Sequence, residues 1–158
     1  MTLWPGSSPG APRPRRACPG TGCAVALYDG HHARIGGLGL TSRAVSHGVP
    51  AFALRAESGG ASLVYSGDTA PCPALTRFAE DCSLLLCEAD SAAHPAGAEP
   101  VHHTPEEAGD TASAARARRL VVTHVGRDLA PAEAVSRAAA RYHGPVDHAA
   151  PGAVFAIG

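Results

Sequence analysis

The alternation of apolar and polar residues changes character about halfway along the chain. Up to Tyr65 the pattern is strand-like, with short segments separated by glycine. Gly36 and Gly37 divide one of these segments, and Gly59-Gly60 is typical of a hairpin turn. The predicted strands in this part are Ala24–Tyr28, Ala33–Val45, Ala51–Leu54 and Ala61–Tyr65.

After Tyr65 the pattern predicts strands that alternate with helices. One helix start is well marked, because Thr104 can serve as N-cap, Pro105 suits the first helical position and Glu107 completes a capping box. The other predicted helices are Pro73–Glu80 and Pro131–Tyr142, and the strands are Ser83–Cys87, Leu120–Thr123, Val146–Ala149 and Ala153–Ile157. Antiparallel strands followed by strand–helix units predict an α/β (α+β layered) fold, a mixed sheet with helices on one face.

Composition supports a single folded domain preceded by a tail. The chain has 158 residues, of which 45% are hydrophobic and 17% charged, and that length suits one domain. Residues 1–23 are rich in Pro, Gly and Arg and are predicted to form a disordered tail, which leaves 24–158 as the domain. Five cysteines without tight spacing argue against a zinc knuckle, and Cys82 and Cys87 are predicted to be buried thiols.

Charge and hydropathy narrow the classes of function. The formal net charge of -1 argues against a dedicated nucleic-acid-binding arm. No apolar run approaches the ~18 residues of a membrane span, and the first residues form no signal peptide. The sequence therefore predicts a cytoplasmic protein that does not associate with membranes.

Polar residues capable of metal chemistry stand at the ends of several predicted strands. Asp68 follows the strand 61–65, His124 ends the strand 120–123, and His47 ends the strand 33–45. His102 precedes the capped helix. Open α/β sheets place ligands at strand ends, and imidazole with carboxylate suits zinc. Taken singly, each residue is more often a hydrogen-bonded loop residue or a helix cap.

Three stretches taken together resemble the C-terminal half of the metallo-β-lactamase fold, an αββα sandwich, in its ribonuclease Z-like and phosphodiesterase-like branch. They are Ser46-His47-Gly48-Val49-Pro50-Ala51-Phe52-Ala53-Leu54-Arg55, Leu63-Val64-Tyr65-Ser66-Gly67-Asp68-Thr69 and His102-His103-Thr104-Pro105-Glu106-Glu107-Ala108-Gly109. The strand Leu120–His124 and the last segment follow in the family's order. The resemblance covers the chain from about Ala33 to its end.

The resemblance implies roles for four residues. His47 matches a ligand of the first zinc, Asp68 the aspartate that bridges both zinc ions, and His124 the histidine of the second zinc. His102 matches the histidine that members with phosphodiesterase activity use as proton donor. A helix N-terminus behind it would also attract a phosphate oxygen. His103 occupies a position that is usually apolar.

The resemblance implies a metal-dependent hydrolase in which zinc-activated water attacks a phosphodiester or other ester, either in a small molecule or in RNA. The family's His-x-His-x-Asp-His motif has no match here, since His31-His32 is adjacent and Asp147-His148 lies in the last predicted strand. The zinc site is therefore expected to be incomplete and the chain to be a truncated form that lacks the N-terminal half. The alternative is a non-catalytic remnant, a homo-oligomer or partner-binding subunit that uses its exposed sheet.

Overall fold

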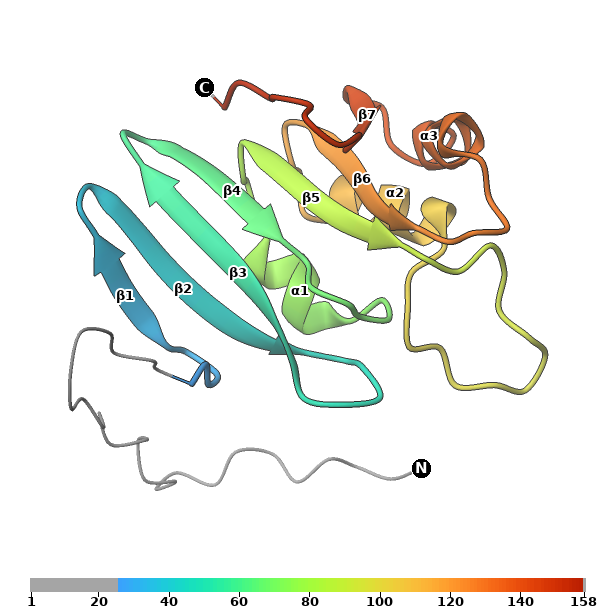
Figure 1. The fold of residues 1–158 in the computed structure, drawn as a ribbon, viewed down its shortest axis with the longest axis horizontal. Coiled ribbons are helices and arrows are strands. Elements are labelled where there is room, and N and C mark those ends of the chain that lie inside the picture. The colour runs from blue at the N-terminus through green and yellow to red at the C-terminus, as the bar shows by residue number, and fades with distance from the viewer. Residues whose placement is uncertain (1–25, 158) are drawn as a thin grey trace.

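A seven-stranded mixed sheet forms the framework of the protein in a computed structural model that describes residues 26–157 (Figure 1). The strands follow one another across the sheet in chain order. Its antiparallel part consists of β1 (His32–Ile35), β2 (Leu38–Val45), β3 (Ala51–Ser58) and β4 (Ala61–Tyr65). Its parallel part continues from β4 with β5 (Leu84–Ala89), β6 (Leu120–Val125) and β7 (Val146–His148). The predicted tail 1–23 lies outside the described residues.

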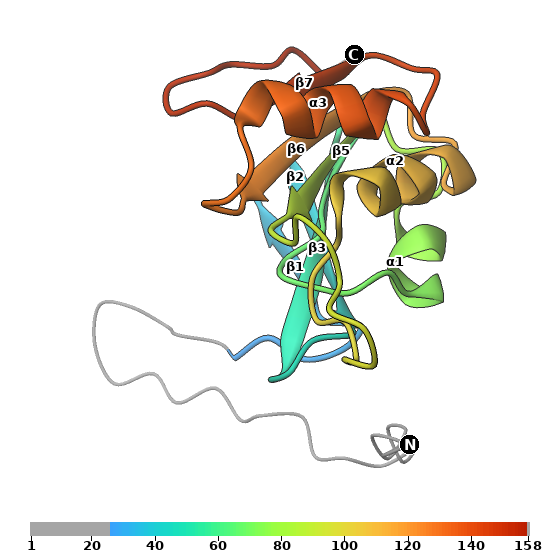
Figure 2. The ribbon, with the colours of Figure 1, turned by 90° about the vertical axis from the view of Figure 1, so that its right-hand side faces the viewer.

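Three helices lie on one side of this sheet, as the sequence predicts (Figure 2). They are α1 (Pro73–Phe78), α2 (Pro105–Ala114) and α3 (Pro131–Ala139). The predicted capping box of α2 is present: the Thr104 hydroxyl accepts from the Glu107 N–H at 3.3 Å, and the Glu107 carboxylate accepts from the Thr104 N–H at 2.8 Å. This cap fixes the start of α2 directly behind His102.

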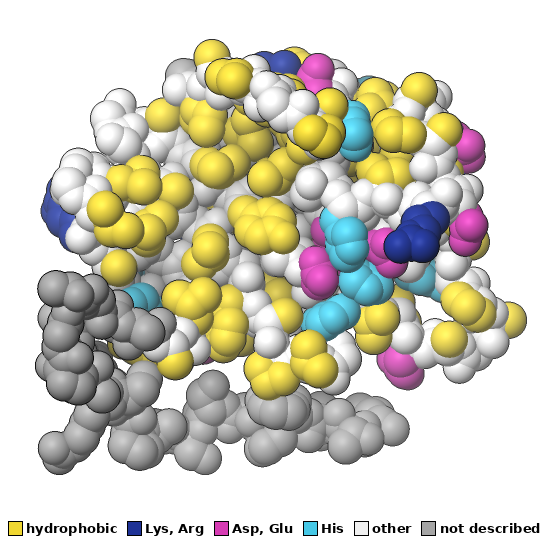
Figure 3. Space-filling model, in the orientation of Figure 1, with side chains coloured by type: hydrophobic (Ala, Val, Ile, Leu, Met, Phe, Trp, Pro, Cys, Tyr) yellow, Lys and Arg dark blue, Asp and Glu magenta, His cyan; other side chains and the backbone are white. Residues whose placement is uncertain are grey.

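The two faces of the sheet differ in how well they are covered. Alternate strand residues pack against the helices and form the core with them; among them are Ala53, Val64, Leu85, Leu120 and Val122. The residues between them project from the opposite face, where several remain half-buried: Phe52, Leu54, Leu63, Tyr65 and Leu86. This second face points toward the viewer in Figures 1 and 3, and hydrophobic side chains are visible across it.

Two predicted strands are wrong. Residues 26–28 form no strand, and the Tyr28 carbonyl instead accepts from the Ser42 hydroxyl and from the His31 N–H. Residues 153–157 also lack strand pairing. There the Arg119 guanidinium stacks over the Phe155 ring at 5.2 Å, so side-chain contact takes the place of a backbone ladder.

The cysteine prediction is confirmed for both residues. Cys82 and Cys87 are completely buried and form no disulfide. Burial raises the pKa of the Cys82 thiol to about 11 and also raises that of Cys87, so both act as apolar core residues. Among residues 26–157, no helix has the length and apolarity needed to cross a membrane.

Candidate metal and catalytic site

The structure brings the four predicted site residues together at one edge of the sheet. Asp68 follows β4 and His124 lies in β6, with His124 Nδ1 3.2 Å from Asp68 Oδ1. The ring centroids of His102 and His124 are 5.4 Å apart, and those of His47 and His102 are 4.9 Å apart. Because β4, β5 and β6 are parallel, their carboxyl ends meet here, and a group of histidine and acidic side chains is visible on the surface in Figure 3.

A tight turn after β4 positions Asp68. Gly67 has a φ of +63°, and a Cβ at this residue would lie 2.6 Å from the Phe52 carbonyl oxygen, so only glycine fits. Thr69 then fastens the turn, because its hydroxyl donates to the Ser46 carbonyl at 3.1 Å. The turn that carries Asp68 is thereby joined to the loop that carries His47.

A β-bulge turns His124 toward the site. The β5–β6 register changes at this point, since Glu88 pairs with Thr123 and Ala89 with Val125, which leaves His124 between them. His124 has a φ of 46°, in the left-handed region that non-glycine residues rarely adopt. Such strain persists at functional sites when the surrounding structure holds it.

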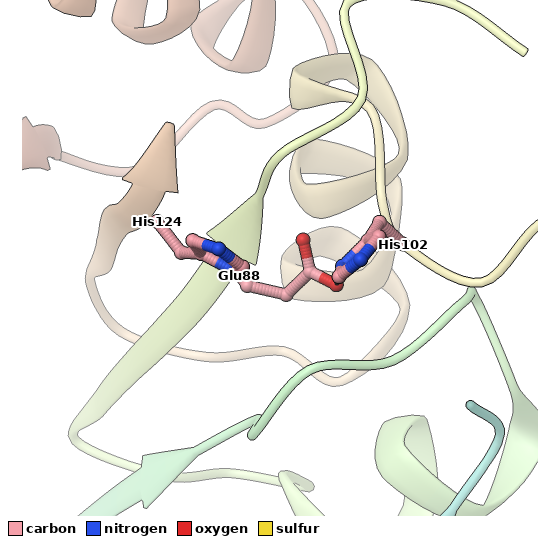
Figure 4. A group of neighbouring side chains, drawn as sticks. All are labelled: Glu88, His102 and His124. Atoms are coloured by element: carbon pink, nitrogen blue, oxygen red, sulfur yellow. The ribbon is translucent and has the colours of Figure 1, made fainter. Parts of the chain in front are cut away.

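Glu88 lies at the base of the site, between the imidazoles of His102 and His124 (Figure 4). Its side chain is completely buried. Oε1 accepts from His102 Nδ1 at 2.8 Å and from the Thr69 N–H at 2.8 Å, and Oε2 accepts from the Asp90 N–H at 3.0 Å. Since a carboxylate only accepts, the proton sits on Nδ1 of His102 and the Nε2 lone pair is left free.

The other two imidazoles are also placed through Nδ1, His47 by a hydrogen bond and His124 by an ion-pair contact. His47 Nδ1 donates to the Val101 carbonyl at 2.8 Å, and His124 Nδ1 lies within hydrogen-bond distance of Asp68. In each ring Nε2 is left available. Histidine ligands of metals are usually oriented by a hydrogen bond to the second nitrogen, an arrangement that His47 and His102 show here.

Asp90, just after β5, faces two of these free nitrogens. Its Oδ2 lies 3.9 Å from His102 Nε2 and its Oδ1 lies 3.7 Å from His124 Nε2. A Cβ at Gly126 would lie 2.0 Å from the Asp90 carbonyl oxygen. The absence of a side chain at Gly126 therefore lets the ends of β5 and β6 approach closely, which brings Asp90 to His124.

His103 is a structural residue. It is completely buried, its Nδ1 donates to the Thr69 carbonyl at 2.7 Å, and its Nε2 accepts from the Thr111 hydroxyl at 3.1 Å. Desolvation lowers the pKa of His103 below its ordinary value of 6.5, so the ring is neutral at pH 7. It ties α2 to the turn that carries Asp68.

Sequence reasoning missed Glu88 and Asp90. Glu88 directly follows the predicted buried strand Ser83–Cys87 and Asp90 comes two residues later, so the strand-end rule that identified Asp68 and His124 would also have selected them. The sequence pairs His31-His32 and Asp147-His148 contribute nothing to this site. His32 bonds to Thr41 within the β1–β2 hairpin, and Asp147, in β7, pairs with Arg119.

Comparison with known proteins agrees with this architecture. A family model described as the beta-lactamase superfamily domain matches residues 16–125. The metallo-β-lactamase fold protein YhfI of Bacillus subtilis superposes with a TM-score of 0.76 at 26% identity, covering 83% of this chain and 54% of that one. The chain therefore belongs to the metallo-β-lactamase superfamily, which has a hydrolase-like fold and whose members generally bind metals.

The relatives place the chain in the ribonuclease Z-like branch. An uncharacterized protein of Mycobacterium leprae is 35% identical over 130 residues, which cover 82% of this chain and 46% of that protein. Ribonuclease Z of Myxococcus xanthus is 40% identical over 102 residues, 62% of this chain and 33% of that enzyme. The chain thus spans about half the length of the mycobacterial relatives and about a third of that ribonuclease Z.

Proposed function

We propose that the protein hydrolyses a phosphodiester or other ester bond in the cytoplasm, with a zinc-activated water as nucleophile. The observation that carries this proposal is the convergence of His47, Asp68, His102 and His124, which come from four separate segments, on one edge of the sheet. Such a convergence of imidazole and carboxylate groups is typical of a metal-dependent active site. The family membership supports the same reaction class.

The donor set fits zinc. His47, Asp68 and His124 would hold the metal, and their imidazole and carboxylate groups are ordinary zinc ligands. Zinc lowers the pKa of a bound water to about 7 and so supplies hydroxide at neutral pH. Three residues are too few for a two-zinc centre, and we propose that the complete protein adds ligands from a second, N-terminal half of the fold.

His102 would protonate the leaving oxygen from Nε2. Its Nδ1–H stays hydrogen-bonded to Glu88. The buried carboxylate would hold the ring in place and stabilise the imidazolium form until the Nε2 proton is transferred. His102 also stands immediately before α2, whose N-terminus favours negative charge. A phosphate group at this edge would therefore meet both a proton donor and a favourable helix dipole.

The charge distribution favours a small substrate. The net charge is -1, and six of the ten arginines in the described part of the chain form ion pairs with carboxylates, such as Arg137 with Glu106. RNA binding depends on an excess of positive charge facing the phosphates. We therefore propose a small phosphodiester as substrate, although ribonuclease Z relatives make RNA the natural comparison.

Because the complete zinc centre is proposed to need ligands from an N-terminal half, the test is zinc-dependent hydrolysis of bis(p-nitrophenyl) phosphate by the protein purified with that half, with a labelled tRNA transcript as second substrate. We expect Asp68→Asn to abolish turnover and His102→Ala to reduce it by ~10²–10⁴-fold, while the exposed control Asp128→Asn keeps the wild-type rate. Equal rates in wild type and Asp68→Asn would refute the assignment. If the protein cleaves the tRNA transcript but not bis(p-nitrophenyl) phosphate, the proposed substrate becomes RNA.

One observation favours a second function, binding of a partner through the open sheet face. The half-buried residues on that face form a row across three neighbouring strands; they are Phe52, Leu54, Leu63, Tyr65 and Leu86. Exposed apolar faces of this kind mark interaction sites. Size-exclusion chromatography with light scattering tests self-association: an inactive dimer that Leu63→Glu converts to monomer supports this function, and an active monomer contradicts it.

A further inference from the structure

Exposed apolar residues lie on one side of the candidate site. One pair begins two residues after His47, in the loop between β2 and β3, and the other pair directly precedes His102 at the end of the loop 90–101. All four residues are exposed, and we call them the apolar lip: Val49, Pro50, Pro100 and Val101. Val49 is 65% exposed and Val101 is 40% exposed, so both keep apolar surface in contact with solvent.

Contacts at the site hold the two halves of the apolar lip together. His47 Nδ1 donates to the Val101 carbonyl at 2.8 Å, and a Cβ at Gly48 would lie 3.9 Å from Val101 Cγ1. In Figure 3, hydrophobic side chains adjoin the group of histidines on the surface. Single exposed apolar residues are common on any protein surface. Apolar residues that two distant segments bring to one place instead mark a binding site.

The other side of the site is charged. The Asp90 carboxylate is partly exposed beside His124, and the loop that follows β6 presents Arg127 and Asp128 to solvent. The four residues of the apolar lip carry no charge. Ligand sites commonly combine apolar walls with a few polar groups that fix the orientation of the ligand. A substrate with one apolar group would therefore place that group on the apolar lip.

We infer that the apolar lip binds the leaving group of the substrate and that this group carries an aromatic ring. In the proposed hydrolysis, water adds to phosphorus, the bond from phosphorus to the leaving oxygen breaks, and that oxygen takes the proton of His102 Nε2. Val101 is the chain neighbour of His102, and the His47 and His102 ring centroids are 4.9 Å apart, so the leaving group is released beside the apolar lip.

The shape of the apolar lip favours a ring. It is an open surface made of short valine and proline side chains, and a flat aromatic group buries a large apolar area against such a surface. This inference rests on the proposed function and narrows its substrate class to phosphodiesters with an aromatic leaving group. Val49 and Val101 thereby become residues that determine specificity without taking part in the chemistry.

The experiment compares benzylphosphonate with methylphosphonate, two inhibitors that share the phosphonate group and differ in the ring. Their inhibition constants are measured against turnover of bis(p-nitrophenyl) phosphate by the protein used in the hydrolase test. We expect the wild type to bind benzylphosphonate about tenfold more tightly, and Val49→Ser and Val101→Ser each to lower this preference about threefold. The matched control is Val154→Ser in the last segment, where the valine is 93% exposed, and it is expected to keep the wild-type preference.

Equal affinity of the wild type for the two inhibitors would overturn the inference, and so would a preference that neither serine variant changes. Loss of the N-terminal half from purified Val101→Ser would also overturn it, because the apolar lip would then be a contact between the two halves. Should a serine variant fold poorly by circular dichroism, Val101→Leu decides. This variant keeps an apolar side chain and must retain at least the wild-type preference for benzylphosphonate.

Thymidine 5′-monophosphate distinguishes two sources of the aromatic ring. If Val101→Ser weakens its inhibition as much as that of benzylphosphonate, the leaving group is a nucleotide, and if its inhibition is unchanged, the leaving group is an aryl alcohol. Either result supports the inference. If the protein hydrolyses no phosphodiester, the proposed function fails by itself, and calorimetry with zinc present then measures the preference between the two phosphonates directly.

Discussion

The antiparallel and parallel parts of the sheet differ in burial and in chemistry. Every residue of β1 is exposed and β2 buries only Ser42, whereas all residues of β5 except Leu86 are buried. The difference follows from the helices, which pack chiefly over β5, β6 and β7, although α1 also contacts β2. Parallel strands are covered because their connections are helices that return across the sheet.

The site follows the same division. The mutually parallel strands β4, β5 and β6 and their loops supply Asp68, Glu88, Asp90, His102 and His124, whereas the antiparallel strands β1, β2 and β3 and their loops supply only His47. Parallel strands all have their carboxyl ends at the same edge of the sheet, so polar residues at those ends lie close together. Antiparallel strands end at alternate edges and cannot gather residues in this way.

The largest expected effect comes from the core of the parallel part. Leu85→Ala removes a fully buried side chain from β5 and is expected to lower the free energy of unfolding by ~2–5 kcal/mol. The control is Ile35→Ala in β1, where the side chain is 66% exposed and a change within ~0.5 kcal/mol is expected. Urea denaturation measures both, and equal losses would contradict the division described above.

Glu88→Gln is expected to have the next largest effect. Glutamine keeps the shape but places an amide NH₂ against groups that already donate, the Thr69 N–H, the Asp90 N–H and His102 Nδ1. An unsatisfied buried donor costs about 1–3 kcal/mol. Glu57→Gln in β3, whose side chain is 57% exposed, serves as control. A Glu88 variant as stable as this control would show that the buried carboxylate is not required for the fold.

Acid is expected to destabilise the protein through His103. Burial lowers the pKa of His103 in the folded state below 6.5, so as pH falls through 6.5 the unfolded chain takes up a proton that the folded chain does not. Stability therefore decreases from pH 7.5 to 5.5, by at most ~1.4 kcal/mol per pH unit for this group. The difference in unfolding free energy between the two pH values should shrink in His103→Leu and persist in the exposed His32→Gln. If the unfolding free energy of His103→Leu depends on pH as strongly as that of the wild type, the acid effect comes from another titratable group.

The smallest effect is expected at the loop beside the site. Arg137 pairs with Glu106 at 2.7 Å and donates to the Ala92 carbonyl at 2.7 Å, which fastens the loop 90–101 to α2 and α3. These groups are partly exposed, so Arg137→Ala is expected to cost no more than ~1 kcal/mol of global stability. Hydrogen exchange is the more sensitive measurement. In Arg137→Ala the backbone amides of the loop 90–101 are expected to exchange faster than in the wild type, whereas those of β5 are expected to exchange at the same rate. Equal protection in both proteins would refute this role of Arg137.

Much of the fold was predictable because its signals are local. The capping box at Thr104 and the apolar strand 83–87 each depend on neighbours in sequence, and both appear in the structure as expected. The wrong strands at the two ends, 24–28 and 153–157, had suitable composition. A strand also needs a neighbouring strand to pair with, and in the described residues of these segments no ladder forms.

The sequence by itself determined which residues could carry chemistry, because His47, Asp68, His102 and His124 stand at predicted strand ends or before a capped helix. Only the tertiary structure decided which atoms face one another. The bulge at His124, the close approach permitted by Gly126 and the buried Glu88 beneath both rings all depend on segments far apart in the chain. Residue types and spacing are local, whereas the Nε2 atoms meet at Asp90 only because strand register and packing set the distances between segments.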